Sequence, residues 1–135
     1  MRELFVSKLL LVVIGIVFLQ WINFAEAASI EQAFQRHKSD VQVKGSGTVS
    51  FLLKDDNKGS RHQKFVLKVS SGQTILIVHN IDLAPRINSI SKGDIVQFYG
   101  EYEWNAKGGL VHWTHRDPNN RHIGGWLKHN GKIYQ

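Results

Sequence analysis

The 135-residue sequence contains no cysteine, which excludes disulfide bonds and metal sites built from thiolates. Its longest uninterrupted apolar stretch, Leu9 to Leu19, is well below the roughly 20 residues that a membrane-spanning helix needs. The part of the chain after this N-terminal segment is about the size of one small domain, with no room for two hydrophobic cores. The mature chain is therefore expected to be one small domain without disulfide bonds.

The first 27 residues have the features of a secretory signal peptide. A positively charged start is followed by the apolar stretch and then by Ala25-Glu26-Ala27, a small-x-small cleavage pattern. We predict a signal peptide over residues 1–27, with no stable membrane insertion after cleavage. The alternative is a retained membrane anchor, because more apolar residues come after the stretch, although Gln20 and Asn23 interrupt them. Export without disulfides favours a bacterial periplasm or exterior.

The remainder of the chain consists mostly of strand patterns. Ser29 and Gln32 form a capping-box pattern, which predicts a short helix and linker over residues 28–40. A domain over residues 41–135 comes next, and its side chains alternate between apolar and polar with the period of a strand. The expected strands cover residues 41–54, 64–69, 74–78, 94–104 and 110–116, and an Asn-Gly turn predicts a final hairpin.

This order predicts an all-β fold, a small five-stranded OB-fold-like barrel with a short N-terminal helix. A long first strand bent at glycines can pair on both sides and close such a barrel, and a jelly-roll fragment is the main alternative. The helix usual between the third and fourth strands is reduced to a loop, because Pro85 interrupts it. The expected inward-facing core residues are Phe51, Phe65, Leu67, Ile77, Val96, Phe98, Val111 and Trp113.

Two strand-end segments, His79–Arg86 and His112–His122, concentrate imidazole, carboxylate and guanidinium groups. Such loops are where rigid scaffolds usually present functional groups. The predicted binding residues are His62, Lys64, His79, Asn80, Asp82, Arg86, His112, His115 and Asp117. Imidazole and carboxylate groups would also suit a divalent metal ion, with His79, Asp82, His115 and His122 as candidate ligands. The structural alternative is that these side chains order the loops.

The best-supported expectation is binding of a polar or anionic ligand: an oligonucleotide, an oligosaccharide or a metal. The formal net charge of +6 favours a polyanion, although it also aids solubility. Basic side chains on the second strand would suit single-stranded nucleic acid or an oligosaccharide, or they simply form the wet face of a sheet.

A metal-dependent, nuclease-like phosphodiester hydrolase is one alternative. Its candidate catalytic residues are Asp82, Arg86 and His115, with Asp55 or Asp56, Glu101 or Glu103, and Arg61 as further groups of the required types. The spacings of staphylococcal-type nucleases are not reproduced. Another alternative is a structural interaction module, so the sequence leaves open whether the protein is an enzyme.

Four segments resemble the bacterial domain-of-unknown-function family catalogued as number 3465. They are Arg61-His62-Gln63-x-Phe65, the run His79 to Arg86, Gly100 to Asn105, and Gly108 to His115. The resemblance spans about Val41 to Tyr134. It implies a small exported bacterial protein and favours the barrel, but it supplies no activity and no catalytic residues.

The signal-peptide pattern makes one direct prediction. Because Ala25 and Ala27 occupy the small positions, the mature protein should begin at Ala28. Intact-mass measurement or N-terminal sequencing of exported protein checks this. Protein found only in membranes and still carrying Met1 would contradict it.

Overall fold

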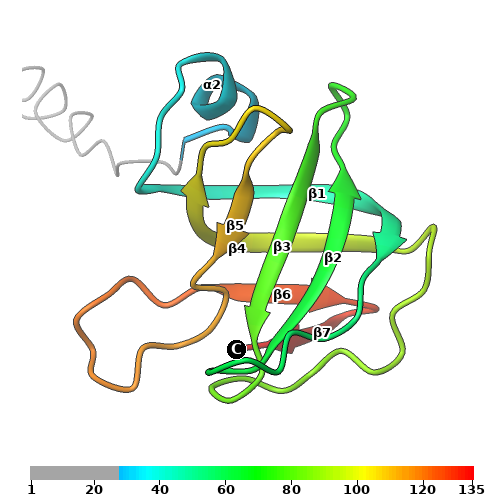
Figure 1. The fold of residues 1–135 in the computed structure, drawn as a ribbon, viewed down its shortest axis with the longest axis vertical. Helices are drawn as coiled ribbons and strands as arrows, with labels where there is room; N and C mark the ends of the chain where they lie inside the picture. The colour runs from blue at the N-terminus through cyan, green and yellow to red at the C-terminus, as the bar shows by residue number, and fades with distance from the viewer. Residues whose placement is uncertain (1–27) are drawn as a thin grey trace, which may run out of the picture.

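The computed structural model describes residues 28–135, which form a barrel with one short helix (Figure 1). The elements are α2 (Ile30–Gln35), β1 (Val41–Leu52), β2 (His62–Lys68), β3 (Thr74–Asn80), β4 (Ile95–Glu103), β5 (Leu110–His112), β6 (Trp126–His129) and β7 (Lys132–Tyr134). The predicted signal peptide lies outside these residues. Within residues 28–135, no helix has the length and apolar character to cross a membrane.

The barrel closes through five strands in the order β1-β2-β3-β5-β4, with β4 returning to pair with β1. All of these pairs are antiparallel except β3 with β5. Figure 1 shows the β2–β3 hairpin crossing the β1–β4 pair. The predicted five-stranded OB-fold-like barrel is therefore confirmed. The expected C-terminal hairpin is also present, as β6 and β7, and its turn residues Asn130 and Gly131 both have positive φ.

The short helix begins as its sequence predicts. The Ser29 hydroxyl accepts a hydrogen bond from the backbone N–H of Gln32 at 3.2 Å, which satisfies one of the free donors of the first turn. Ile30 and Ala33 are buried and belong to the same hydrophobic cluster as the barrel core. The helix is thus tied to the barrel by its apolar face.

The barrel core agrees with the alternation of the sequence at six of the eight expected positions. Those buried as predicted are Phe65, Leu67, Ile77, Val96, Phe98 and Val111. The predicted burial of Phe51 is wrong, because its side chain is 62% exposed. The register shifts between Val49 and Phe51, so the bulge at Ser50 turns Phe51 to the outside opposite Val66. The predicted core position of Trp113 is also wrong, because its side chain is only half-buried. Its φ of 54° takes the chain out of the strand.

The loop between β3 and β4 replaces a helix at one end of the barrel, as expected. Ile87 is fully buried there. The side chain of Gln63, on β2, donates to the carbonyl of Ile87 at 2.8 Å and accepts from its N–H at 2.9 Å. This double hydrogen bond satisfies a buried backbone group and fixes the loop across the barrel end.

One edge of β4 is shared by two strands, and this arrangement positions the candidate site. β5 pairs with residues 101–103 of β4, and β6 pairs with residues 96–99 on the same edge. Between them the chain leaves the sheet as the loop 113–125, which projects from the barrel in Figure 1. A side chain at Gly100 would collide with the His112 carbonyl, and one at Gly125 with the Trp113 carbonyl. The expected fifth strand, 110–116, ends at His112, because the positive φ of Trp113 takes the chain out of the strand.

The strand phase of β4 can be tested by a matched pair of substitutions. Phe98→Ala should lower the free energy of unfolding by about 3–5 kcal/mol, because Phe98 is fully buried in the core. Its neighbour Gln97 points outward, so Gln97→Ala should change that free energy by less than about 0.5 kcal/mol. Denaturant unfolding of both variants measures this, and equal losses would contradict the assigned phase.

Candidate functional site

His79 is held inside the protein by both of its ring nitrogens. The side chain is fully buried, with Nδ1 2.7 Å from the Thr114 hydroxyl and Nε2 3.0 Å from the Pro85 carbonyl. Because a carbonyl only accepts, Nε2 donates and Nδ1 accepts from Thr114. Burial lowers the His79 pKa to about 4. His79 is therefore a neutral link between the loop after β3 and the loop 113–125.

Asp82 and Arg86 each form an ion pair, but not with each other. Arg61 donates to the Asp82 carboxylate from its backbone N–H at 2.9 Å and from Nε at 2.7 Å. These bonds lower the pKa of Asp82. Arg86 donates from two nitrogens to the carboxylate of Asp55, at 2.8 and 3.1 Å. Both groups lie in exposed pairs that connect loops of the barrel end.

Asn80 and Asp117 organise their own loops. The Asn80 side-chain oxygen accepts from two backbone N–H groups of the turn that comes after it. The Asp117 carboxylate accepts three backbone N–H groups, from Asn119, Arg121 and His122, at 2.8–2.9 Å. These bonds lower the Asp117 pKa. Asp117 thus fixes the backbone that carries His122.

Four of the predicted residues line one cavity of about 220 Å³. Its lining is His62, Asn80, His112 and His115, with Val78, Leu83 and Trp113. Lys64 lies beside this cavity, because it pairs with Val78 across β2 and β3. His79, Asp82, Arg86, Asp117 and His122 are not among the lining residues.

Two histidines of the cavity have their ring orientation fixed by backbone carbonyls. Nδ1 of His62 lies 2.8 Å from the Ser60 carbonyl, and Nδ1 of His115 lies 2.7 Å from the Arg116 carbonyl. Each Nδ1 therefore carries a proton, and in the neutral ring Nε2 keeps its lone pair. Since Nδ1 is used, Nε2 is the nitrogen that each ring can offer to a ligand.

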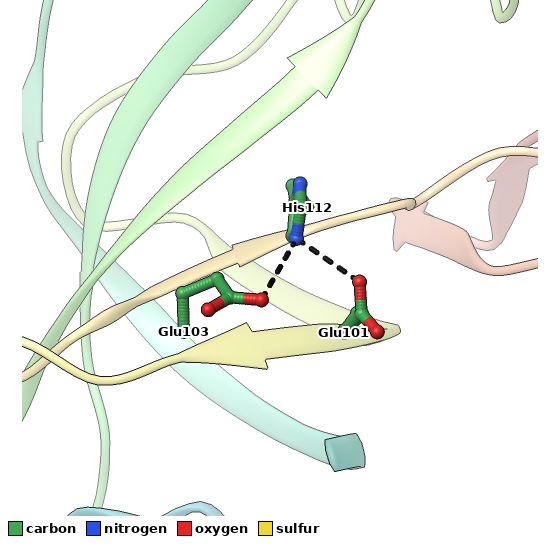
Figure 2. Close-up of side chains that lie close together, drawn as sticks. All are labelled: Glu101, Glu103 and His112. Atoms are coloured by element: carbon green, nitrogen blue, oxygen red, sulfur yellow. Dashed lines mark ion pairs between the residues drawn. The ribbon is translucent and has the colours of Figure 1, made fainter. Parts of the chain in front are cut away.

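His112 also belongs to a second cluster, with Glu101 and Glu103 (Figure 2). Its Nε2 lies 3.2 Å from Oε2 of Glu101 and 3.5 Å from Oε1 of Glu103. The two glutamates share a face because they are two residues apart on β4, and Glu101 is opposite His112 on β5. One ligand atom from each residue lies within 4.8 Å of the others.

His122 extends this cluster from the loop 113–125. Its Nε2 lies 3.3 Å from Oε1 of Glu101, the oxygen that does not face His112. The His122 ring stacks on Trp113 at 3.9 Å, and its Nδ1 is 2.8 Å from the Ile123 carbonyl. Nδ1 therefore carries the proton, so a neutral His122 presents a lone pair to the carboxylate. Such a pair of acceptors is stabilised only by a proton or a cation between them.

The cluster has an excess of negative charge. Burial raises the pKa of Glu103, and a hydrogen bond and charge repulsion from Asp40 raise it further. Glu101 acts in the same direction, whereas His112 opposes it. Two carboxylates thus face His112, and a third, Asp40, lies against Glu103, an arrangement that favours a bound cation.

Two buried nitrogen atoms beside Glu101 lack hydrogen-bond partners. Among residues 28–135, the buried side-chain atoms without a partner are Gln42 Nε2, His112 Nε2 and His129 Nδ1. Gln42 and His112 are the two cross-strand neighbours of Glu101. Buried polar groups are usually paired, so these two nitrogens mark positions where the side chains around Glu101 are not fully hydrogen-bonded.

The structure thus groups the predicted metal ligands differently from the sequence. Of His79, Asp82, His115 and His122, only His122 reaches the carboxylate cluster, while His115 lines the neighbouring cavity. The sequence pattern pointed to Glu101 and Glu103 only as carboxylates of a nuclease and not as partners of His112. Their spacing of two residues on a predicted strand was the signal that they face the same way.

The model of one protein family, described as "Protein of unknown function (DUF3465)", matches residues 12–135. No curated protein matches the chain.

The buried His79 predicts a pH dependence of stability. The folded protein keeps His79 neutral down to about pH 4, whereas the unfolded chain binds its proton below about pH 6.5. The free energy of unfolding should therefore fall as the pH decreases from about 6.5 to about 4. The difference between wild type and His79→Gln, measured by denaturant unfolding at each pH, isolates this contribution. His37→Gln, at an exposed histidine, is the control. A pH-independent difference would contradict the neutral assignment.

Proposed function

The chain belongs to the DUF3465 family, which brings no activity with it, and we propose from its own geometry that it binds a divalent metal ion. The ligands are Glu101, Glu103 and His112. The observation that carries the proposal is the buried Nε2 of His112, which faces two carboxylates without forming a hydrogen bond to either.

The distances within the cluster suit a transition metal. Zinc binds imidazole nitrogen and carboxylate oxygen at about 2.0–2.2 Å, which places tetrahedral ligand atoms roughly 3.3–3.5 Å apart. The nitrogen–oxygen separations of 3.2 and 3.5 Å at His112 fall close to this range. The two separations from His112 therefore suit such an ion, and all three ligand atoms lie within 4.8 Å of one another.

The ligand set favours zinc or another ion that accepts both imidazole and carboxylate. Imidazole suits zinc, copper, iron and nickel, whereas carboxylates also suit manganese. Three protein ligands leave at least one coordination position for water or substrate, as in catalytic zinc sites.

His122 has the features of a supporting residue of the same site. It contacts the second oxygen of Glu101, and its own ring is oriented by the Ile123 carbonyl and by Trp113. Contacts of this kind orient the ligands of metal sites and tune their affinity. This makes the loop 113–125 part of the proposed site.

The proposal includes export of the mature domain and binding of a polar or anionic ligand next to the metal. The signal-peptide pattern of residues 1–27 supports export. The cavity that His112 shares with His62, Asn80 and His115 supports the ligand. The competing structural function, an interaction module without a metal, would leave His112 as an imidazolium paired with two glutamates.

Metal titration separates these two functions. Calorimetry of the chelator-treated protein with zinc or manganese chloride should show one site per chain and a raised melting temperature. Loss of a contact that merely supports a metal ligand typically costs 10–100-fold in affinity. Glu101→Gln and His112→Gln should therefore each weaken binding by at least about 100-fold. Glu31→Gln, which removes a carboxylate from α2, is the matched control.

The same titration should depend on pH. The metal competes with protons for Glu103, whose pKa is raised, and for His112. Affinity should therefore fall as the pH decreases, with proton release on binding at neutral pH. Absence of binding by the wild type at neutral pH would overturn the proposed function and favour the ion-paired module.

A further inference from the structure

The outer face of the barrel next to the metal cluster is unusually apolar. Register pairs place Phe51, Val66, Leu76 and Leu110 in one cross-strand row that ends at Glu103. These side chains point away from the core, and all are half-buried or exposed, Phe51 to 62%. The solvent face of an antiparallel sheet is normally polar, so an apolar row of this length marks a binding surface.

Lysines flank this row on both sides. Lys64 and Lys68 lie two residues before and after Val66 on β2, and they share its outward face. No acidic residue is present on the outward face of β2 or β3. An apolar row between two cations fits a single-stranded nucleic acid, whose bases stack on apolar and aromatic side chains while its phosphates meet lysines.

The cavity beside His112 continues the same surface toward the loops. It lies next to the row of Lys64 and Val78, and its lining contains no carboxylate. His115 is 4% exposed, with Nδ1 occupied by the Arg116 carbonyl, so Nε2 is its free proton acceptor at this cavity. His112 lines the cavity and also belongs to the cluster with Glu101 and Glu103, so an anion bound in the cavity would lie next to the proposed metal site.

We infer that the protein hydrolyses phosphodiester bonds of single-stranded nucleic acid, with the strand lying across β2, β3 and β5 and the reacting phosphate at Glu101, Glu103 and His112. This inference rests on the proposed metal site. It names the substrate of that site and assigns a role to the apolar row and to His115.

The reaction needs no co-reactant other than water. A metal ion held by Glu101, Glu103 and His112 would lower the pKa of a water molecule at this site. Nε2 of His115 would take a proton from that water as its oxygen bonds to phosphorus and the bond from phosphorus to the leaving oxygen breaks. The leaving oxygen takes a proton from solvent or from the protonated His115. The products are a phosphate monoester end and a free hydroxyl end, so atoms and charge balance.

Binding and cleavage of labelled 20-nucleotide single strands, DNA and RNA, test this inference on the purified protein. With zinc or manganese, the wild type should cut single strands, and neither chelator-treated protein nor Glu101→Gln should do so. A duplex of the same sequence should be cut more slowly, because its bases cannot stack on the apolar row.

Substitutions on the outer face separate substrate binding from metal binding. The double variant Lys64→Ala/Lys68→Ala should weaken binding of the single strand and reduce the salt dependence of log K by about 1–2. Its metal affinity should equal that of the wild type. Lys132→Ala, on β7, removes a lysine from another strand and is the matched control.

The role of His115 has its own readout. His115→Gln should lower kcat at least tenfold with little change in KM, while its metal affinity equals that of the wild type. If this variant fails to fold, His115→Asn replaces it and should show the same loss of kcat. A folded variant with the kcat of the wild type would overturn this role.

The two proposals fail in different ways. If zinc and manganese do not bind, the proposed metal site is wrong and the hydrolysis falls with it. If the metal binds normally but single strands are neither bound nor cut, only the inferred activity is overturned. Cleavage that persists in Glu101→Gln or in chelator would likewise overturn it.

Discussion

The hydrogen-bonding edge of β4 that faces away from β1 is covered by two separate strands, β5 and β6, and the candidate site depends on this arrangement. β5 covers residues 101–103 and β6 covers residues 96–99, so the chain must leave the sheet and return to it at Gly100. Backbone carbonyls crowd this point, and only glycine fits at Gly100 and Gly125. The loop formed between the two strands brings His122 and Trp113 back against Glu101. The strand pairing that covers this edge of β4 therefore also brings His122 against Glu101.

A second regularity is that nearby backbone carbonyls orient the imidazoles. His62, His115 and His122 each donate Nδ1–H to a carbonyl no more than two residues away. These bonds are local, so each ring can be aimed without changing the barrel. In the neutral rings they leave Nε2 as the acceptor, the form in which histidine binds metals and takes up protons. His79 uses the opposite nitrogen and has no free one, which separates its structural role from the others.

The alternation of apolar and polar residues along the strands predicted most of the core. It did so because every second side chain of a strand points to the same face, and one face of each strand is buried. It failed at Phe51 and Trp113, where a bulge and a positive φ change the backbone in ways that alternation does not encode. The outward position of His112 was predictable, but its contact with Glu101 required the register between two strands. The partner of Asp82 was not predictable, because loops far apart in sequence meet only in the folded barrel.

The pairing of β1 with β4 also has a consequence for how the chain folds. Val41 meets Tyr102, so the first strand cannot be completed until most of the domain has been synthesised. Contacts between distant segments require loop closure before they contribute any stability, and barrels rich in them fold in milliseconds to seconds. The hairpin of β2 and β3 can form early, whereas the N-terminal strand stays available to other partners until late. A chain with so many contacts between distant segments stays unfolded long enough to meet chaperones.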